Sequence, residues 1–219
     1  EKIINYVERQ IMQGSYKKGD KLPPERELAA LLSASRNSVR EGLGILERMG
    51  VISSQQGAGN FISDNFEKTL IEVMTLMFIL EEGTFREISE FRYALEMQAL
   101  SLAMKNITEE QQTDIEYYMS MLEQTPGEEQ KAYYDKKIHY TITAASGNRF
   151  IIDNLQALTE VMDVFIKDMR AKILSDGSNS EGLMSAHRQM VEALREKDES
   201  KGLKALKAHF EYIYAYIDG

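Results

Sequence analysis

Two short β-prone runs near the start of the chain limit the possible folds, because no other segment offers a convincing strand. The runs lie on either side of Gly57 and Gly59 in VISSQQGAGNFIS, and glycines between two such runs favour a β-hairpin. Elsewhere apolar residues recur at helical intervals, and turn signals separate the segments. The expected fold class is therefore mostly α, with a single hairpin.

Three helical segments precede the hairpin. The first is predicted over residues 1–13 and ends at Gly14; its pattern is already under way at Glu1, so we expect a few native residues before it. Pro24 at a first helical position opens the second, and Ser35 is a good N-cap for the third, which Gly50 ends. The stripes expected to be buried in the last two are Leu28, Ala29, Leu31 and Leu32, and then Val39, Leu43, Leu46 and Met49.

Two helices joined by a tight turn and followed by a hairpin wing predict a winged helix-turn-helix over residues 1–65. The polar face of the third helix carries residue types that reach guanine, adenine and phosphate oxygens in the major groove of double-stranded DNA. These are Arg36, Asn37, Ser38 and Arg40. The wing glycines would let the backbone approach DNA closely. A small helical domain with ordinary surface arginines is the plainer alternative.

Charge is divided unevenly along the chain. The net charge is −9, but residues 1–66 hold nine Lys/Arg and eight Asp/Glu, whereas residues 67–219 hold 17 and 27. A nearly neutral module can still bind DNA when its basic side chains share one face, because phosphate contacts depend on local charge. The acidic remainder is not expected to touch DNA.

From residue 66 onward the pattern predicts six or seven helices in an antiparallel bundle. Residues 66–82 are assigned to a linker or first helix, and residues 83–219 to an effector domain. Capping boxes at Thr84 to Glu87 and at Thr108 to Gln111 mark two helix starts, and the polar run at residues 175–182 marks a turn. No apolar stretch approaches the roughly 20 residues of a membrane-spanning helix, so we expect no anchor and no signal peptide.

The bundle sequence holds all the histidines of the chain. It has no cysteine, so a transition-metal site must use imidazole and carboxylate ligands. Asp135 and His139 lie four residues apart and share a helix face, while His187 and His209 lie on the apolar faces of two later helices. A single histidine on such a face is usually a satisfied core residue. Three of them with an aligned carboxylate are most simply explained by one divalent metal ion.

The segment GDKLPPERELAALLSASRNSVREGLGILERMGVISSQQGAGNFI resembles the GntR family of bacterial transcription regulators. The resemblance implies DNA contacts by Arg26, Arg36 and Arg40, and a wing tip at Gly57 or Gly59. It also implies a homodimer on a palindromic operator.

One departure from the family pattern lies in the third helix. Gly42 and Gly44 stand where the family usually has Ala or a bulkier residue. Each glycine costs a helix roughly 0.5–1 kcal/mol relative to Ala.

The segments DKKIH, AHRQMVEAL and LKAHF resemble the FCD effector domain of the FadR subfamily of these regulators, over about residues 75 to 218. The resemblance implies that the metal ligands are Asp135, His139, His187 and His209. Octahedral Zn²⁺, Ni²⁺, Mn²⁺ or Fe²⁺ would keep two positions open for water or a ligand, whereas tetrahedral Zn²⁺ would keep none. The sequence does not choose among them.

Family members commonly sense small organic acids, so a carboxylate effector is expected at the open metal positions, paired with Arg92. Arg92 is equally explained as a surface or helix-packing salt-bridge residue. Asn148 is a second effector candidate, although a capping role for the following helix ranks ahead of it.

Taken together, these patterns predict a cytoplasmic, ligand-responsive transcription regulator that acts as a repressor and has no catalytic activity. Two alternatives remain. One is a metal-dependent hydrolase or oxygenase, because histidines and a carboxylate around an open cation also describe catalytic sites. The other is a regulator of the same fold that binds its effector without metal.

Overall fold

A computed structural model describes residues 1–64, 67–175 and 177–217 of the chain. The chain divides into two compact units, Glu1–Glu72 and Val73–Gly219. The division falls in the stretch that the sequence analysis treats as a linker or first helix, and the expected boundary at residues 65 and 66 lies outside the described residues. Each unit has its own apolar core.

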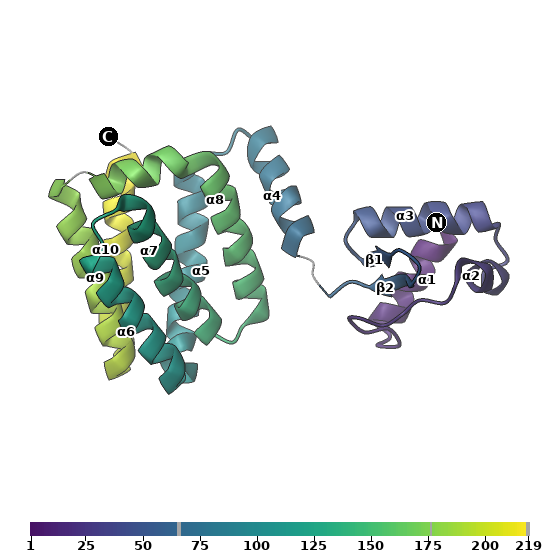
Figure 1. Cartoon of the computed structure of the whole chain (residues 1–219), viewed down its shortest axis with the longest axis horizontal. Coiled ribbons are helices and arrows are strands. Elements are labelled where there is room, and N and C mark those ends of the chain that lie inside the picture. Colours follow the sequence, from purple (N-terminus) through teal and green to yellow (C-terminus); the bar gives the residue numbers. More distant parts are fainter. Residues whose placement is uncertain (65–66, 176, 218–219) are drawn as a thin grey trace. The chain divides into compact units, whose positions relative to one another are not determined.

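The first unit is a winged helix-turn-helix (Figure 1). Its elements are α1 (Lys2–Met12), α2 (Glu25–Leu31), α3 (Arg36–Arg48), β1 (Ile52–Gln55) and β2 (Gly59–Ile62). The strands are antiparallel, with Ile52 opposite Ile62 and Gln55 opposite Gly59. Lys21 forms an isolated bridge with Phe61, which adds the segment before α2 to the edge of the hairpin.

Local sequence signals account for most ends of these helices. Ser35 accepts a hydrogen bond from the backbone N–H of Ser38 and so caps α3, as expected. Gly14 and Gly50 follow α1 and α3 with positive φ, the conformation that glycine adopts at little cost. Pro24 is the N-cap of α2, one position earlier than its expected place inside the helix.

The core of the first unit is built by α1, α2, α3 and the hairpin. Its most deeply buried residues are Ile3, Val7, Leu22, Leu28, Val39, Leu43, Leu46, Ile52 and Ile62. Two expected members are exposed instead: Leu31 is 60% exposed and Met49 is 49% exposed. Leu31 points away from the side of α2 that holds Leu28 and Ala29, and Met49 is already the C-cap of α3.

Packing between α1 and α3 explains one of the two unusual glycines. A Cβ atom at Gly42 would lie 2.1 Å from Cγ2 of Ile3, so the close approach of α1 requires glycine there. At Gly44 the nearest atom would be Nη1 of Arg48, at 3.7 Å, which is ordinary contact. The structure therefore gives a packing reason for Gly42 and none for Gly44.

Seven helices follow the hairpin among the described residues, in agreement with the expected six or seven (Figure 1). They are α4 (Glu67–Leu80), α5 (Phe85–Asn106), α6 (Glu109–Gln124), α7 (Glu128–Ala145), α8 (Arg149–Ser175), α9 (Gly177–Glu196) and α10 (Glu199–Ile217). Both predicted capping boxes are present, at the starts of α5 and α6. The turn expected at residues 175–182 is wrong for its described residues, because α8 includes Ser175 and α9 already begins at Gly177; residue 176 lies outside the described part.

In the bundle, α5 packs against α7, α8 and α10, while α9 lies along α10 and also meets α6. The core they enclose includes Leu100, Ile115, Leu122, Ile138, Met190, Leu194, Leu206 and Phe210. This arrangement brings α5, α7, α9 and α10 together around one interior region. Within the described residues, every helix is too short or too polar to cross a membrane.

Candidate functional site

Four polar side chains converge in the interior of the bundle. Asp135 and His139 come from α7, His187 from α9 and His209 from α10, and each is at most 6% exposed. One nitrogen from each imidazole lies within 4.8 Å of the others. Oδ1 of Asp135 lies 2.9 Å from Nε2 of His187 and 3.9 Å from Nε2 of His139. All four predicted metal ligands therefore meet in one buried place.

Hydrogen bonds fix which ring nitrogens face the centre. Nδ1 of His187 lies 2.9 Å from the carbonyl oxygen of Leu183, which can only accept, so Nδ1 is the donor. Nδ1 of His139 lies 2.8 Å from Oε2 of Glu96 and donates to that carboxylate. The Nε2 atoms of the two rings therefore face the centre, where they lie 3.2 Å apart.

His209 completes the cluster with a neutral ring. Burial, together with the neighbouring His187 and His139, lowers the pKa of His209 well below its usual value. Its Nδ1 is buried and has no hydrogen-bond partner among the described residues. Buried polar atoms are normally paired, so an orphaned imidazole nitrogen beside two converging Nε2 atoms and a carboxylate fits a divalent ion held by nitrogen and carboxylate ligands.

Glu96 on α5 is a functional residue that the sequence analysis did not single out. It joins His139 to Arg92: Nε of Arg92 donates to Oε1 of Glu96 at 2.5 Å, and all three side chains are buried. Burial alone would raise the pKa of Glu96, but Arg92 and His139 outweigh it and lower the pKa to about 2. The carboxylate is therefore charged and orients His139, as outer-shell carboxylates do in metal sites. The spacing of Arg92 and Glu96 in RYALE was the available signal.

The structure places Arg92 in a buried ion pair with Glu96 on the same helix, whereas the alternative expected from the sequence was a surface or helix-packing salt bridge. Its guanidinium also lies over the ring of Phe210, 5.6 Å from the centroid. A carboxylate effector would have to share Arg92 with Glu96.

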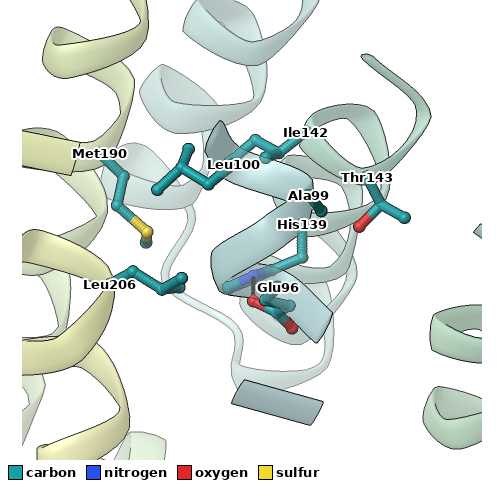
Figure 2. A pocket seen from close by; sticks show the side chains of 8 residues that line it. All are labelled: Glu96, Ala99, Leu100, His139, Ile142, Thr143, Met190 and Leu206. Carbon is teal, nitrogen blue, oxygen red and sulfur yellow. Dashed lines mark hydrogen bonds and ion pairs between the residues drawn. The ribbon is translucent and has the colours of Figure 1, made fainter. Parts of the chain in front are cut away.

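A small cavity lies beside Glu96 and His139 (Figure 2). Its walls come from α5, α7, α9 and α10, and the lining residues are Glu96, Ala99, Leu100, His139, Ile142, Thr143, Met190 and Leu206. The cavity volume is about 10 Å³, which is about the room that one water molecule needs. An organic acid is larger, so its binding at this point requires the surrounding helices to move apart.

Asn148 has a structural role at the start of α8. Its side-chain oxygen accepts hydrogen bonds from the backbone N–H groups of Phe150, at 3.1 Å, and Ile151, at 3.3 Å. This is N-cap geometry, the role that ranked ahead of effector contact. Asn148 is not among the residues that line the cavity.

In the first unit, the predicted DNA-contacting side chains lie on the exposed surface. Arg36, Asn37, Ser38 and Arg40 occupy the exposed first half of α3, and Arg26 is exposed on α2. Gly57 lies in the turn of the hairpin at φ +77°, and a Cβ atom added there would have nothing within 4 Å. Gly59 is the first residue of β2, at φ +107°. Of the two glycines, Gly57 is the one at the wing tip.

Arg40 has a partner that the sequence analysis did not anticipate. Its guanidinium is held by the carboxylate of Glu25 on α2, with Nη2 to Oε2 at 2.6 Å and Nε to Oε1 at 3.1 Å. The hydrogen bond from Arg40 is the main cause of the lowered pKa of Glu25, to which Arg36 also contributes. The carboxylate of Glu25 on α2 is thus held beside the basic face of α3.

These features define a class of protein: a DNA-binding transcription regulator with a winged helix-turn-helix and a separate all-helical effector domain. Residues 1–62 match the model for bacterial regulatory proteins of the gntR family, and residues 87–212 match the model for the FCD domain. The chain belongs to the GntR regulators that carry an FCD domain, consistent with the FadR subfamily.

Related proteins span both units. The chain is 26% identical to the "Putative L-lactate dehydrogenase operon regulatory protein" of Escherichia coli K12 over 98% of its own length and 84% of that protein. It is 29% identical to the "Glc operon transcriptional activator" of E. coli K12 over 74% of its length and 66% of that protein. A solved structure of Streptococcus agalactiae GntR covers 98% of the chain, and the chain covers 97% of that structure, with 22% identity and a TM-score of 0.64.

The solved structure shows the same fold. The family and these relatives are transcription regulators and not enzymes, which removes the metal-dependent hydrolase or oxygenase from consideration.

Proposed function

We propose that the protein is a repressor that senses a small organic acid through a divalent metal ion held by Asp135, His139, His187 and His209. The observation that carries this proposal is the buried convergence of three imidazoles and one carboxylate, with the Nε2 atoms of His139 and His187 facing each other. A bound divalent ion supplies a positive anchor for carboxylate oxygens. The protein acts in the cytoplasm as a homodimer on a palindromic operator.

The net charge of the bundle interior supports a carboxylate effector whose binding depends on the metal ion. The ordinary charges of Arg92, Glu96 and Asp135 sum to −1, which disfavours the transfer of an anion into this buried region. With a divalent ion bound, the same site would be at +1 and would complement one carboxylate. The L-lactate dehydrogenase operon in the name of one relative is consistent with this class of effector.

The small cavity supports coupling between effector binding and helix movement. Because its volume of about 10 Å³ cannot hold an organic acid, the bound state must differ from this one in the spacing of α5, α7, α9 or α10. A ligand that fits only the expanded bundle shifts the population toward it. In a dimer, such a shift changes how well two winged domains match paired half-sites and so releases DNA.

Helix α4 supports the homodimer. Five of its apolar side chains are more than half exposed: Val73 56%, Leu76 58%, Met77 55%, Ile79 51% and Leu80 78%. Contiguous exposed apolar side chains commonly mark protein interfaces. A second copy of the chain would also supply the second winged domain that a palindromic operator requires.

Operator release tests the proposal. A duplex enriched by the protein from a random pool serves as the operator, and its binding is titrated with short carboxylates, beginning with L-lactate, on metal-loaded and chelated protein. The proposal expects at least one acid to weaken DNA binding of the metal-loaded protein and to have little effect after chelation. Equal release with and without metal would favour a regulator that binds its effector directly, and stronger operator binding with the acid would indicate an activator.

A further inference from the structure

Glu25 occupies one particular edge of the Arg40 guanidinium. Nε of Arg40 lies 3.1 and 3.2 Å from the two carboxylate oxygens, and Nη2 lies 2.6 Å from Oε2. A guanidinium has five N–H donors in a rigid plane. The contact with Glu25 uses the Nε–H and the Nη2–H beside it, so both Nη1–H groups and the outer Nη2–H remain at the far end.

That far end is left available for DNA. One N–H from Nη1 and the outer N–H from Nη2 are parallel donors, which suit a bidentate contact to O6 and N7 of guanine or to a phosphate. Arg40 is 67% exposed on its side chain and lies one helical turn beyond Arg36 on the polar face of α3. With Glu25 behind it, the guanidinium plane is held in place before DNA arrives.

The geometry points to Glu25 as a positioning residue that holds Arg40 in the orientation needed to discriminate between base pairs. This inference rests on the proposed DNA-binding function and adds a specificity-determining residue from α2 to the recognition surface of α3. Because Glu25 is itself an anion close to the DNA phosphates, it opposes sequence-independent binding. The Glu25 carboxylate thus favours binding to the correct sequence through Arg40, while its own charge weakens binding to every sequence by a similar amount.

A purely structural role for the pair is weaker on physical grounds. Ion pairs at the surface contribute little to folding stability, because their charges are already well solvated and their long side chains lose freedom. The side chain of Glu25 is 32% exposed and that of Arg40 is 67% exposed. The effect of losing Glu25 should therefore appear in DNA discrimination and not in the melting temperature.

The test compares Glu25→Ala with Glu27→Ala. Both substitutions remove one carboxylate from the first turn of α2, but Glu27 is exposed, and the hydrogen bonds of Arg40 go to Glu25. The probes are the duplex that the wild-type protein enriches from a random pool and a shuffled duplex of the same composition. The ratio of the two affinities should fall about fivefold or more in Glu25→Ala, since a good bidentate base contact discriminates by at least that factor. Glu27→Ala should leave the ratio unchanged, while both variants bind the shuffled duplex more tightly.

A double-mutant comparison isolates the contact with Arg40. In an Arg40→Ala background, Glu25→Ala should no longer change the ratio, because its effect passes through the guanidinium. An equal ratio in Glu25→Ala, Glu27→Ala and wild type would overturn the inference, as would a fall in the ratio that persists without Arg40. Failure of the wild-type protein to enrich any duplex would contradict the DNA-binding function itself, which is a separate outcome.

Discussion

The two units of this protein differ in where their candidate functional polar residues lie. In the winged helix-turn-helix, Arg36 and Arg40 lie on the surface, over an apolar core in which they take no part. In the bundle, Arg92, Glu96 and the histidine cluster lie inside the core. A residue of the first kind can be removed at little cost to folding. A residue of the second kind contributes both to folding and to the proposed site, so ligand binding at that site can change the packing of the bundle.

Metal removal should cause the largest change in stability, and only the bundle should be affected. Metal present at about a thousand times its dissociation constant stabilises the folded state by about 4 kcal/mol, and chelation removes that contribution from the bundle. Differential scanning calorimetry should show the bundle transition moving to lower temperature, with the winged-helix transition unchanged. An Asp135→Ala/His187→Ala variant should not respond to the chelator. Movement of both transitions would contradict the separation of the units.

Arginine substitutions in α3 should have the converse effect. Arg36→Ala or Arg40→Ala removes a DNA contact and should weaken operator binding by about 1–3 kcal/mol. Fluorescence anisotropy on the enriched duplex measures this loss, and the metal content of both variants should equal that of wild type. His187→Ala should do the reverse: its metal content should fall while its operator affinity stays at the wild-type level. Unchanged operator affinity in the arginine variants would count against α3 as the recognition helix.

Glu96 offers a sharper test inside the bundle. Loss of an outer-shell carboxylate usually costs about 10- to 100-fold in metal affinity, so Glu96→Gln should weaken metal binding by that factor. Competition with a chromogenic chelator gives the affinity directly. Glu90→Gln is the matched control, because Glu90 is exposed on the same helix and pairs with Arg86. If both variants bind metal equally well, Glu96 does not orient His139 for coordination.

Substitution of the two unusual glycines by alanine should change the stability of the winged unit in opposite directions and leave the bundle unaffected. Gly42→Ala places a methyl group 2.1 Å from the side chain of Ile3 and should destabilise that unit by about 1–3 kcal/mol. Gly44→Ala meets only the end of Arg48 and should stabilise it by roughly 0.5–1 kcal/mol. Urea denaturation of each variant measures the difference. Destabilisation by Gly44→Ala would show that a methyl group does not fit at position 44.

Sequence patterns predicted most of the fold because they act locally. The N-cap at Ser35, both capping boxes and the hairpin glycines each fix a nearby element, and the structure contains them all. The errors arose where an end or a face depends on tertiary packing. Leu31 belongs to a helix of only seven residues with room for one narrow buried face, and the need for Gly42 depends on where α1 lies.

The candidate sites were predictable in their principal residues but not in the partners of those residues. Asp135 and the three histidines could be named from spacing and residue type, since few other side chains bind transition metals. Glu25 and the role of Glu96 could not, because glutamate is common on helix surfaces: the i,i+4 spacing offers Arg92 as a partner of Glu96, but only the packing of α5 on α7 brings Glu96 to His139, and only that of α2 on α3 brings Glu25 to Arg40. Asn148 could serve as a cap or as a ligand on sequence grounds, and its hydrogen bonds show the cap.

Metal content, measured by mass spectrometry on tag-free protein beside an identically purified Asp135→Ala/His187→Ala variant, is the most direct test of the bundle as a metal-dependent sensor. We expect about one divalent ion per chain in the wild-type protein and its loss in the variant. A wild-type protein that is metal-free and stays empty after incubation with Zn²⁺, Ni²⁺, Mn²⁺ and Fe²⁺ would contradict the metal site. The winged helix-turn-helix would still stand, and the effector would have to bind the histidine cluster directly.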